Sequence, residues 1–499
     1  MEKKPSINIP EEVSRVPEEL KKAGFEAYLV GGCVRDVLSG RKPKDWDVTT
    51  NAQPEKIERL FANTFYENDY GTVGIVNEDI SDETLKVIEV TPYRIEGKYS
   101  DKRRPDTITF AKTLEDDLKR RDFTINAIAL SIEKISGETH KFSIIDPHGG
   151  SIDLTKGIIR AVGKADERFK EDALRVLRAV RIATEMKFVL DKDTEAALIA
   201  DGDLLGHISA ERIRDEFVKI LMSDMPADGL RLAHKLGILK YILPELEEGI
   251  GIEQNKAHAF DVWEHLLKTL QHSADKKWPL HIRLAAILHD ISKPETRRKN
   301  PSTGEWTFYG HDVVGARKVR VILERLKFSH EIIDKVTRLV RWHMFFSDTE
   351  TITLSAVRRL ATNVGPENVW DLMNVRMCDR IGTGRPKESP YRLRKYQSMI
   401  EEALRSPLTV GMLKINGTDI MSICELKPGR EIGYILHALL EEVLENPELN
   451  TKEYLENRAN MLAKLPIDEL KKIGEKAKLA REEEDEKIVE EIRKKYWVK

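Results

Sequence analysis

Two carboxylates separated by one residue, Asp45 and Asp47, are the first feature of this sequence that could do chemistry. We predict that they lie in a β-strand, where side chains alternate, so both carboxylates point to one face and Trp46 points to the other. At about 7 Å apart along a strand, the two charges repel unless a cation lies between them. Mg²⁺ is usually held by one or two carboxylates together with substrate phosphates, so the pair predicts a magnesium site.

A glycine pair, Gly31 and Gly32, follows a short apolar strand at residues 28–30 and leads into a helical turn that carries Arg35. Glycine lets backbone N–H groups approach an anion closely, and Arg35 adds positive charge, so this segment predicts a phosphate site. Taken singly, each of the two motifs is more often a turn or a solvated strand edge. Together, a phosphate site beside a metal site indicates nucleotidyl transfer.

A third carboxylate is expected on a neighbouring strand. Within residues 84–94, Ile88 and Val90 share one face of the predicted strand and Glu89 lies on the other. Glu89 is therefore a candidate to face the Asp45–Asp47 strand, and the alternative is an exposed strand glutamate.

The next two segments add basic and amide groups. Residues 95–110 are rich in charge and glycine without periodicity, which predicts a functional loop whose Arg103 and Arg104 could meet a phosphate or a base. Residues 114–130 predict the start of an amphipathic helix followed by an apolar segment. Three polar residues there are expected near one face at roughly helical spacing: Arg121, Asp122 and Asn126.

A helix predicted over residues 170–183 places Asp172 and Arg175 on one face, with Leu174 and Leu177 on the core side. The alternative is an ion pair on a solvated surface. Cytosine and adenine both offer an exocyclic amine beside a ring acceptor, so a carboxylate and a guanidinium together would accept C and A and reject U and G.

A second group of residues suggests another metal site. His289 and Asp290 are adjacent on a predicted apolar helix, where charge is costly to bury unless it is paired or metal-bound. Imidazole with carboxylate accepts Mg²⁺, Mn²⁺, Fe, Co or Ni. His311 and His343 would suit a second metal or a phosphate contact. The remaining histidines are expected at the surface or satisfied in the core: His258, His272 and His281.

The composition is that of an ordinary soluble protein with several domains. The chain has 499 residues and a net charge of −3, which argues against a broadly basic nucleic-acid binder. Its three cysteines are far apart, so neither a disulfide framework nor a thiolate zinc site is expected. There is no apolar leader and no run of 18 apolar residues, so we expect a cytoplasmic protein without a membrane span.

Five stretches in order, YLVGGCVRDVLSGRKPKDWDVTT, VIEVTPYR, YSDKRRPD, DDLKRRDFTINAIA and EDALRVLRAVR, resemble the class II tRNA nucleotidyltransferases, the CCA-adding enzymes of the polymerase β-like superfamily. The later ISAERIRDEF and residues 409–450 are also similar to bacterial members. The resemblance covers roughly residues 20–456. It implies template-independent addition of CCA to the tRNA 3′ end from CTP and ATP, with two Mg²⁺ ions at the head.

The same resemblance implies roles for individual residues. Asp45 and Asp47 would hold the catalytic metals, with Glu89 as a candidate to complete the shell, and Asp172 and Arg175 would read the base. The triphosphate and ribose would be positioned by the other nucleotide-binding residues: Gly31, Gly32, Arg35, Arg121, Asp122, Asn126 and Arg178. The flexible loop would include Tyr99, Asp101, Arg103 and Arg104.

Further along, His265, His289, Asp290 and Asp379 resemble the ligand set of the HD superfamily of metal-dependent phosphohydrolases. The resemblance implies a divalent metal at this site, with His311 and His343 nearby. It also implies phosphoester hydrolysis, although such a ligand set can persist as a structural metal site.

We therefore predict an α+β chain, with a small polymerase β-like head of mixed sheet and helices followed by an all-α neck, HD body and tail. The predicted domains are a head (1–155), a neck with the base-recognition helix (156–250), an HD domain (251–383) and a tRNA-binding arm with a charged tail (384–499). The rivals that remain are a CC-adding or A-adding enzyme, a poly(A) polymerase, and an HD phosphohydrolase whose head only grips RNA. The oligomeric state stays open.

Overall fold

The computed structural model describes residues 8–66, 71–96, 108–136, 139–254, 259–345, 352–404, 411, 413–445 and 447–473. The chain divides into two compact units, Met1–Arg341 with Ile381–Gly384, and Trp342–Arg380 with Arg385–Lys499. The predicted loop residues Tyr99, Asp101, Arg103 and Arg104 lie outside the described residues, as does His258.

The head is built on a seven-stranded sheet with the strand order β3-β4-β5-β2-β1-β8-β9. The strands β2 and β5 are parallel, and the other neighbouring pairs are antiparallel, so the sheet is mixed as predicted. Its strands are β1 (Ala27–Val30), β2 (Asp47–Thr50), β3 (Thr64–Tyr66), β4 (Val73–Val76), β5 (Val87–Pro92), β8 (Ala129–Ser136) and β9 (Thr139–Ile145).

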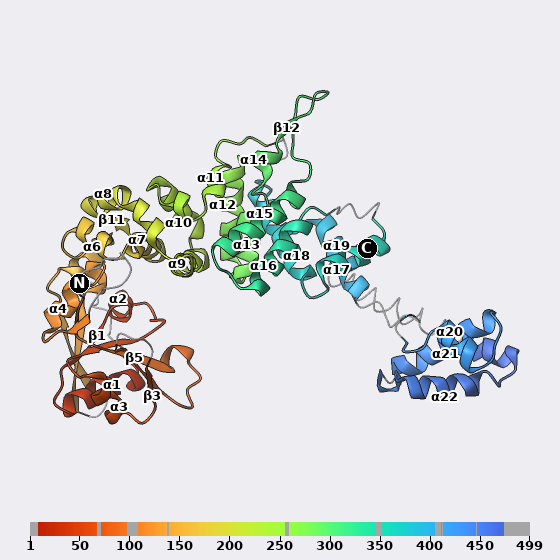
Figure 1. Cartoon of the computed structure of the whole chain (residues 1–499), viewed down its shortest axis with the longest axis horizontal. Helices are drawn as coiled ribbons and strands as arrows, with labels where there is room; N and C mark the ends of the chain where they lie inside the picture. Colours follow the sequence, from red (N-terminus) through yellow and green to blue (C-terminus); the bar gives the residue numbers. More distant parts are fainter. Residues whose placement is uncertain are drawn as a thin grey trace. The chain divides into compact units, whose positions relative to one another are not determined.

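Helices α1 (Glu11–Lys22) and α3 (Pro54–Leu60) close one side of this sheet, and Figure 1 draws them together in dark red. The α1 residues Val13, Val16 and Leu20 are fully buried because their spacing places them on one helical face against the strands. Among the described residues, the remaining head elements are α2 (Gly32–Leu38), the 3₁₀ turn η1 (Glu83–Leu85), the antiparallel strands β6 (Arg94–Glu96) and β7 (Ile108–Phe110), α4 (Leu114–Lys119), the 3₁₀ turn η2 (Thr124–Asn126) and α5 (Gly150–Lys156).

The rest of the first unit is helical, apart from two small pairs of strands. Ile158–Ile159 (β10) runs parallel to Val189–Leu190 (β11), and Arg298–Lys299 (β12) pairs with Trp306–Thr307 (β13). The helices are α6 (Ala165–Glu171), α7 (Leu174–Met186), α8 (Lys192–Ala200), α9 (Ala210–Met222), α10 (Pro226–Lys235), α11 (Pro244–Glu247), α12 (Val262–Asp275), α13 (Leu280–Leu288), α14 (Lys293–Thr296), α15 (His311–Arg325) and α16 (His330–Trp342).

The second unit is also helical. It holds α17 (Leu354–Val364), most of α18 (Val369–Gly382) and α19 (Tyr391–Leu404). Its later helices α20 (Gly417–Ile423), α21 (Arg430–Glu445) and α22 (Lys452–Leu462) share an apolar core that includes Ile435 and Leu455. The predicted α+β architecture, a mixed-sheet head followed by helices, is confirmed. Among the described residues, no helix has the length and apolar content that a membrane crossing requires.

The structure corrects three local predictions. The strand that should contain Asp45 begins only at Asp47, although Trp46 is buried and Asp45 is exposed as the predicted alternation requires. Residues 114–130 do not form one helical face, because α4 ends at Lys119 and a 3₁₀ turn carries Asn126.

The third correction concerns the helix predicted over residues 170–183. It is two helices, α6 and α7, which are interrupted at Asp172 (φ −132°, ψ 104°). The Asp172 carboxylate accepts a hydrogen bond from the backbone N–H of Leu174 at 3.1 Å. Aspartate competes with helical hydrogen bonding in this way and favours helix ends, which explains the break.

Candidate functional site

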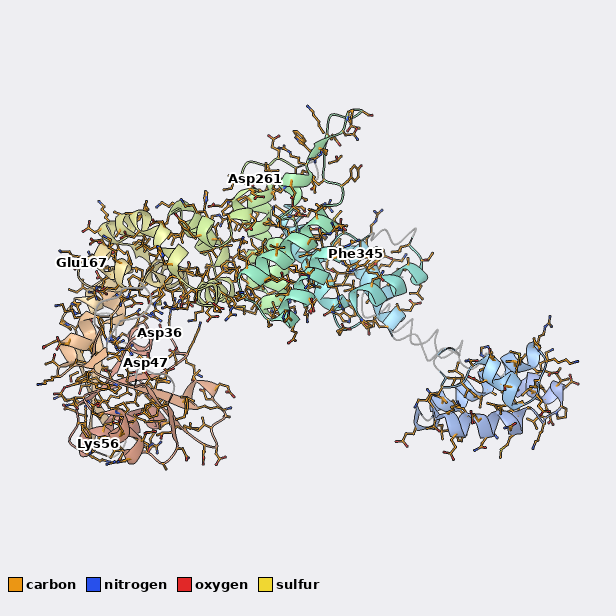
Figure 2. All side chains as sticks on the ribbon, viewed as in Figure 1. Asp36, Asp47, Lys56, Glu167, Asp261 and Phe345 are labelled. Carbon is orange, nitrogen blue, oxygen red and sulfur yellow. The ribbon has the colours of Figure 1, made fainter. Side chains whose placement is uncertain are left out.

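A cavity of about 1080 Å³ opens in the first unit between the head and the neck, and we call it the head cavity. It collects side chains from β2, β5, α2 and the segment after α4 in the head, and from α7 and α9 in the neck. Every described residue predicted for nucleotide chemistry lines it: Gly31, Gly32, Arg35, Asp45, Asp47, Glu89, Arg121, Asp122, Asn126, Asp172, Arg175 and Arg178. Asp36, which the sequence analysis did not single out, lines it as well and is labelled with Asp47 in Figure 2.

The glycine pair lies beside the carboxylates and the arginines that line the head cavity. Gly31 has φ +80°, which L-residues with a side chain rarely adopt. A Cβ built there would lie 3.0 Å from Asp47 Oδ2 and 3.1 Å from Arg121 Nη1. One built at Gly32 would lie 3.9 Å from Asp45 Oδ1. A side chain at Gly31 would therefore be strained and would crowd Asp47 and Arg121, whereas the distances at Gly32 are ordinary van der Waals contacts.

Strand register brings the third carboxylate beside the pair. Asp47 on β2 is the register partner of Glu89 on the parallel strand β5, and partners in a parallel pair project to the same face of a sheet. Ile88 and Val90 are fully buried, whereas Glu89 is half-buried and lines the head cavity. The geometry matches the expected placement of Glu89 opposite the DxD motif. Three carboxylates at one cavity wall fit the oxygen ligands that a divalent cation prefers.

A hydrogen-bonded chain joins the floor of the head cavity to the neck. Arg35 Nη1 donates to Asn126 Oδ1 at 2.9 Å, and Asn126 Nδ2 donates to Asp122 Oδ1 at 3.0 Å. Asp122 Oδ2 accepts from Arg178 Nε at 2.8 Å and Nη2 at 2.6 Å. Burial alone would raise the pKa of the Asp122 carboxyl, but the Arg178 charge and these hydrogen bonds hold it well below the usual range. Asp122 therefore stays ionised and ties the head to α7.

The two residues predicted to read a base are held by different partners. Asp172 Oδ2 accepts from Arg212 Nη2 on α9 at 2.8 Å. Arg175 donates from Nη1 to Glu171 Oε2 and from Nη2 to the backbone oxygen of Arg120, both at 2.8 Å. The alternative of an ion pair between Asp172 and Arg175 on a solvated surface is not what the structure has, because both side chains line the head cavity.

Sequence reasoning missed the residues that support this wall. Glu216 on α9 is 3% exposed and accepts from Arg181 Nε at 2.5 Å. The pKa of Glu216 is lowered despite its burial, because Arg181 and Arg178 lie close to it. The ISAERIRDEF motif, which contains Arg212 and Glu216, was the available signal, but nothing in its spacing indicated which distant side chains it would meet.

Four of the residues predicted for the second metal site meet in the first unit, and we call them the histidine cluster. Asp290 Oδ2 lies 3.1 Å from His265 Nε2 and 3.2 Å from His289 Nε2. Asp290 Oδ1 lies 3.2 Å from His311 Nε2. All four side chains are buried. His289 and Asp290 follow directly after α13, which ends at Leu288, rather than lying inside the helix as predicted.

The hydrogen bonds of the cluster fit a metal. His289 Nδ1 lies 2.9 Å from the backbone oxygen of Ala286, and His311 Nδ1 lies 2.6 Å from that of Phe308. A carbonyl can only accept, so Nδ1 carries a proton in both rings, and Nε2 is the atom that faces Asp290. Ligand atoms on neighbouring metal bonds of about 2.1 Å are separated by about 3 Å, which matches the distances here.

The last two predicted ligands, His343 and Asp379, belong to the second unit. Both are buried, and Asp379 Oδ2 accepts from Arg376 Nη1 at 2.7 Å. Their role as metal ligands stays a prediction.

Three family matches follow the chain in the order of these sites. Residues 27–160 match a family described as the poly A polymerase head domain, and residues 187–250 match one described as the probable RNA- and SrmB-binding site of polymerase A. Residues 262–381 match the HD domain. Nucleotidyltransferase heads and HD domains generally use divalent metals, in agreement with the two carboxylate-bearing sites.

Whole-chain comparisons agree with these matches. The CCA-adding enzyme of Lactiplantibacillus plantarum is 32% identical over 450 residues, which cover 89% of this chain and 95% of that one. The CCA-adding enzyme of Geobacillus kaustophilus is 40% identical over 274 residues, which span 55% of this chain and 62% of the relative. The crystal structure of the Bacillus stearothermophilus CCA-adding enzyme in complex with CTP superposes with a TM-score of 0.60 at 29% identity, covering 90% of this chain and 96% of that one.

Proposed function

The chain belongs to the family of CCA-adding enzymes, and on this premise we propose that it adds C, C and A to the 3′ end of tRNA from CTP and ATP. The observation that carries the proposal is that one cavity gathers the DxD carboxylates, the phosphate-binding turn and the Asp172–Arg175 pair. Ligand pockets usually span about 300–1,000 Å³. A cavity of about 1080 Å³ therefore has room for a nucleoside triphosphate and the end of an RNA strand.

Asp45, Asp47 and Glu89 are the residues that would hold Mg²⁺, and bound Mg²⁺ supplies positive charge at the attacking and leaving oxygens of the transfer. Arg35 and Arg121 bind the triphosphate and orient its α-phosphate in line with the tRNA 3′-hydroxyl. The glycine turn leaves the room that this approach requires. Positioning and charge stabilisation of this kind account for most of the rate of phosphoryl-type transfers.

Asp172 and Arg175 select the nucleotide. The carboxylate accepts from the exocyclic amine of C or A, and the guanidinium donates to the adjacent ring nitrogen. U and G present a carbonyl and a ring N–H at the same places, so each of them would leave a buried group unpaired. Arg212 keeps the Asp172 carboxylate in place for this contact.

The test is incorporation of single labelled nucleotides into three tRNA transcripts, one without CCA, one without the terminal A, and one complete. Full activity predicts CMP addition to the first, AMP addition to the second, and no addition to the third. CMP alone would identify a CC-adding enzyme, AMP alone an A-adding enzyme, and unlimited AMP a poly(A) polymerase. No incorporation, together with phosphate release, would identify a phosphohydrolase with an RNA-gripping head.

A second activity is favoured by the histidine cluster. We propose that it holds Mg²⁺, Mn²⁺, Fe, Co or Ni through His265, His289, Asp290 and His311, and hydrolyses phosphoesters at RNA ends or on nucleotides. Release of phosphate from 2′-phosphate and 2′,3′-cyclic phosphate substrates, measured with each metal in turn, tests it. A wild-type protein that binds metal there without any hydrolysis would make the cluster a structural site.

The cytoplasm is the compartment that we propose for both activities, because CTP, ATP and tRNA precursors are present there. Neither proposal depends on an oligomeric state.

A further inference from the structure

Asp117, on α4, is a fully buried carboxylate that does not line the head cavity. An ionised carboxylate is costly to bury unless several donors compensate it. Burial alone would raise the pKa of Asp117, but the charges of Arg120 and Arg121 outweigh this effect and lower the pKa. Asp117 thus keeps its charge despite the desolvation cost, directly behind the proposed triphosphate site.

The partners of Asp117 connect it to the catalytic strand and to the segment after α4. Arg120 donates to Asp117 Oδ1 from Nε at 2.9 Å and from Nη2 at 2.7 Å. Arg121 Nη2 donates to Asp117 Oδ2 at 3.1 Å, and Thr49 Oγ1, two residues after Asp47 on β2, donates to the same oxygen at 3.3 Å. The carboxylate thus ties two consecutive arginines to the strand that carries the DxD motif.

The Arg121 guanidinium is directed by this contact. Its planar fork is rigid, so fixing Nη2 on Asp117 also fixes the direction of Nη1. Nη1 lies 3.1 Å from the place of a Cβ on Gly31, the same glycine whose Cβ would lie 3.0 Å from Asp47 Oδ2. Arg121 Nε is buried and has no hydrogen-bond partner among the described residues. One edge of the guanidinium is therefore held from behind while its other end reaches the glycine turn.

We propose that Asp117 is a positioning residue that aims Arg121 at the triphosphate of the incoming nucleotide, an inference that rests on the proposed nucleotidyl transfer. Asp117 acts through Arg121 and does not touch the substrate. CTP and ATP carry the same triphosphate, so the loss of Asp117 should weaken the binding of both nucleotides equally. Base selection, which belongs to Asp172 and Arg175, is kept.

The experiment measures binding of inorganic tripolyphosphate to the full-length protein by calorimetry, together with KM and kcat for CTP and ATP. In Asp117→Asn the shape is kept and the charge is removed. We expect tripolyphosphate binding to weaken on the order of tenfold. The KM values for CTP and ATP should rise by a common factor, and the preference for C over U should be unchanged. A purely structural role would lower the unfolding midpoint without this selective loss.

Asp153→Asn is the matched control. Asp153 is also a buried head carboxylate, held by Thr124 Oγ1 at 2.7 Å and Arg160 Nε at 3.1 Å, but it lies outside the lining of the head cavity. This variant should lose stability and keep the affinity for tripolyphosphate. In an Arg121→Ala background, Asp117→Asn should cause no further loss of affinity, because the two residues act as one unit.

If Asp117→Asn does not fold, Asp117→Glu keeps the charge and displaces the carboxylate by one methylene, and it should weaken tripolyphosphate binding several-fold. Wild-type affinity in a folded Asp117 variant would overturn the positioning role, as would full additivity with Arg121→Ala. A wild-type protein that neither binds tripolyphosphate nor incorporates nucleotides would instead overturn the proposed function itself, so the two failures are distinguishable.

Discussion

The head cavity and the histidine cluster both centre on aspartates, but they bury and compensate them in opposite ways. In the head, Asp45 is exposed and Asp47 half-buried at the wall of a large cavity, and arginine is the commonest residue type that lines it. In the cluster, Asp290 is 1% exposed and is surrounded by three imidazoles and Lys293, whose Nζ lies 2.6 Å from its Oδ2.

This difference corresponds to what each site must hold. Arginine forks suit phosphates that enter and leave, and a solvent-filled cavity lets the bound molecule change from nucleotide to pyrophosphate. Imidazoles whose Nδ1 protons are donated to backbone carbonyls suit a resident ion, since their orientation and tautomer are already set. The contrast fits the two proposed activities, turnover of large anions in the head cavity and retention of a small cation in the histidine cluster.

Asp47→Asn should have the largest effect, and it tests whether the head cavity functions independently of the histidine cluster. Removing one carboxylate from the head should lower single-turnover CMP incorporation by at least about 1,000-fold, or about 4 kcal/mol of transition-state stabilisation. Metal content at the histidine cluster, measured by elemental analysis of the dialysed protein, should stay at the wild-type level. Incorporation within tenfold of wild type would show that the DxD motif is not the catalytic centre.

The reciprocal change is Asp290→Ala. It removes the carboxylate that all three imidazoles face, so bound metal and any phosphoester hydrolysis should fall at least about 100-fold. Nucleotide addition should remain within about twofold, because Asp290 is not one of the residues that line the head cavity. A parallel loss of CMP incorporation would mean that the two sites are coupled.

Within the head, Arg175→Ala separates selection from chemistry. The preference for C over U and for A over G should fall about 10- to 100-fold, or about 1.4–2.7 kcal/mol, because one of the two groups that read the base is lost. Competition assays with paired nucleotides measure the ratio directly. If the ratio were preserved in this variant, another residue would have to read the base.

The smallest expected effects are on stability, in Asp122→Asn and then in Glu167→Gln. Breaking this head-to-neck ion pair should cost about 2 kcal/mol, discounted from a fully buried pair because the Arg178 side chain is 33% exposed. Glu167, labelled in Figure 2, forms an exposed ion pair with Lys164, and Glu167→Gln should leave the free energy of unfolding almost unchanged.

The pH dependence of the same pair has a definite sign. The pKa of Asp122 is lowered in the folded protein, so its stabilisation is fully present above the unfolded value of about 3.9 and is lost as the pH falls below it. Urea unfolding should give a constant difference between wild type and Asp122→Asn from pH 7 to about pH 4. The difference should narrow at lower pH, and a difference that already narrowed near pH 6 would contradict the depressed pKa.

Local spacing was enough to predict the centre of the head site. Alternation within residues 84–94 correctly separated Glu89 from the buried Ile88 and Val90, because neighbours two residues apart share a face in any strand. The positive φ of Gly31 likewise follows from a local turn. In each case the residues that carry the sequence pattern and the residues whose conformation it predicts are only a few positions apart.

Contacts between distant elements could not be predicted in the same way. Arg212 meets Asp172 across 40 positions, and nothing in the period of either helix indicates the partner. The break before α7 is an intermediate case. Aspartate is a common helix-capping residue, so Asp172 carried a signal that the apolar periodicity of residues 170–183 concealed.

The series of hydrogen bonds from Arg35 through Asn126 and Asp122 to Arg178 also determines which way the Asn126 amide is turned. An arginine can only donate and an ionised carboxylate can only accept, so the Asn126 amide must turn its oxygen to Arg35 and its NH₂ group to Asp122. Reversal would set donor against donor and acceptor against acceptor. Asn126 thus accepts from a cation through its oxygen and donates to an anion through its nitrogen. A carboxylate could only accept and an ammonium or guanidinium could only donate, so no charged side chain could make both hydrogen bonds.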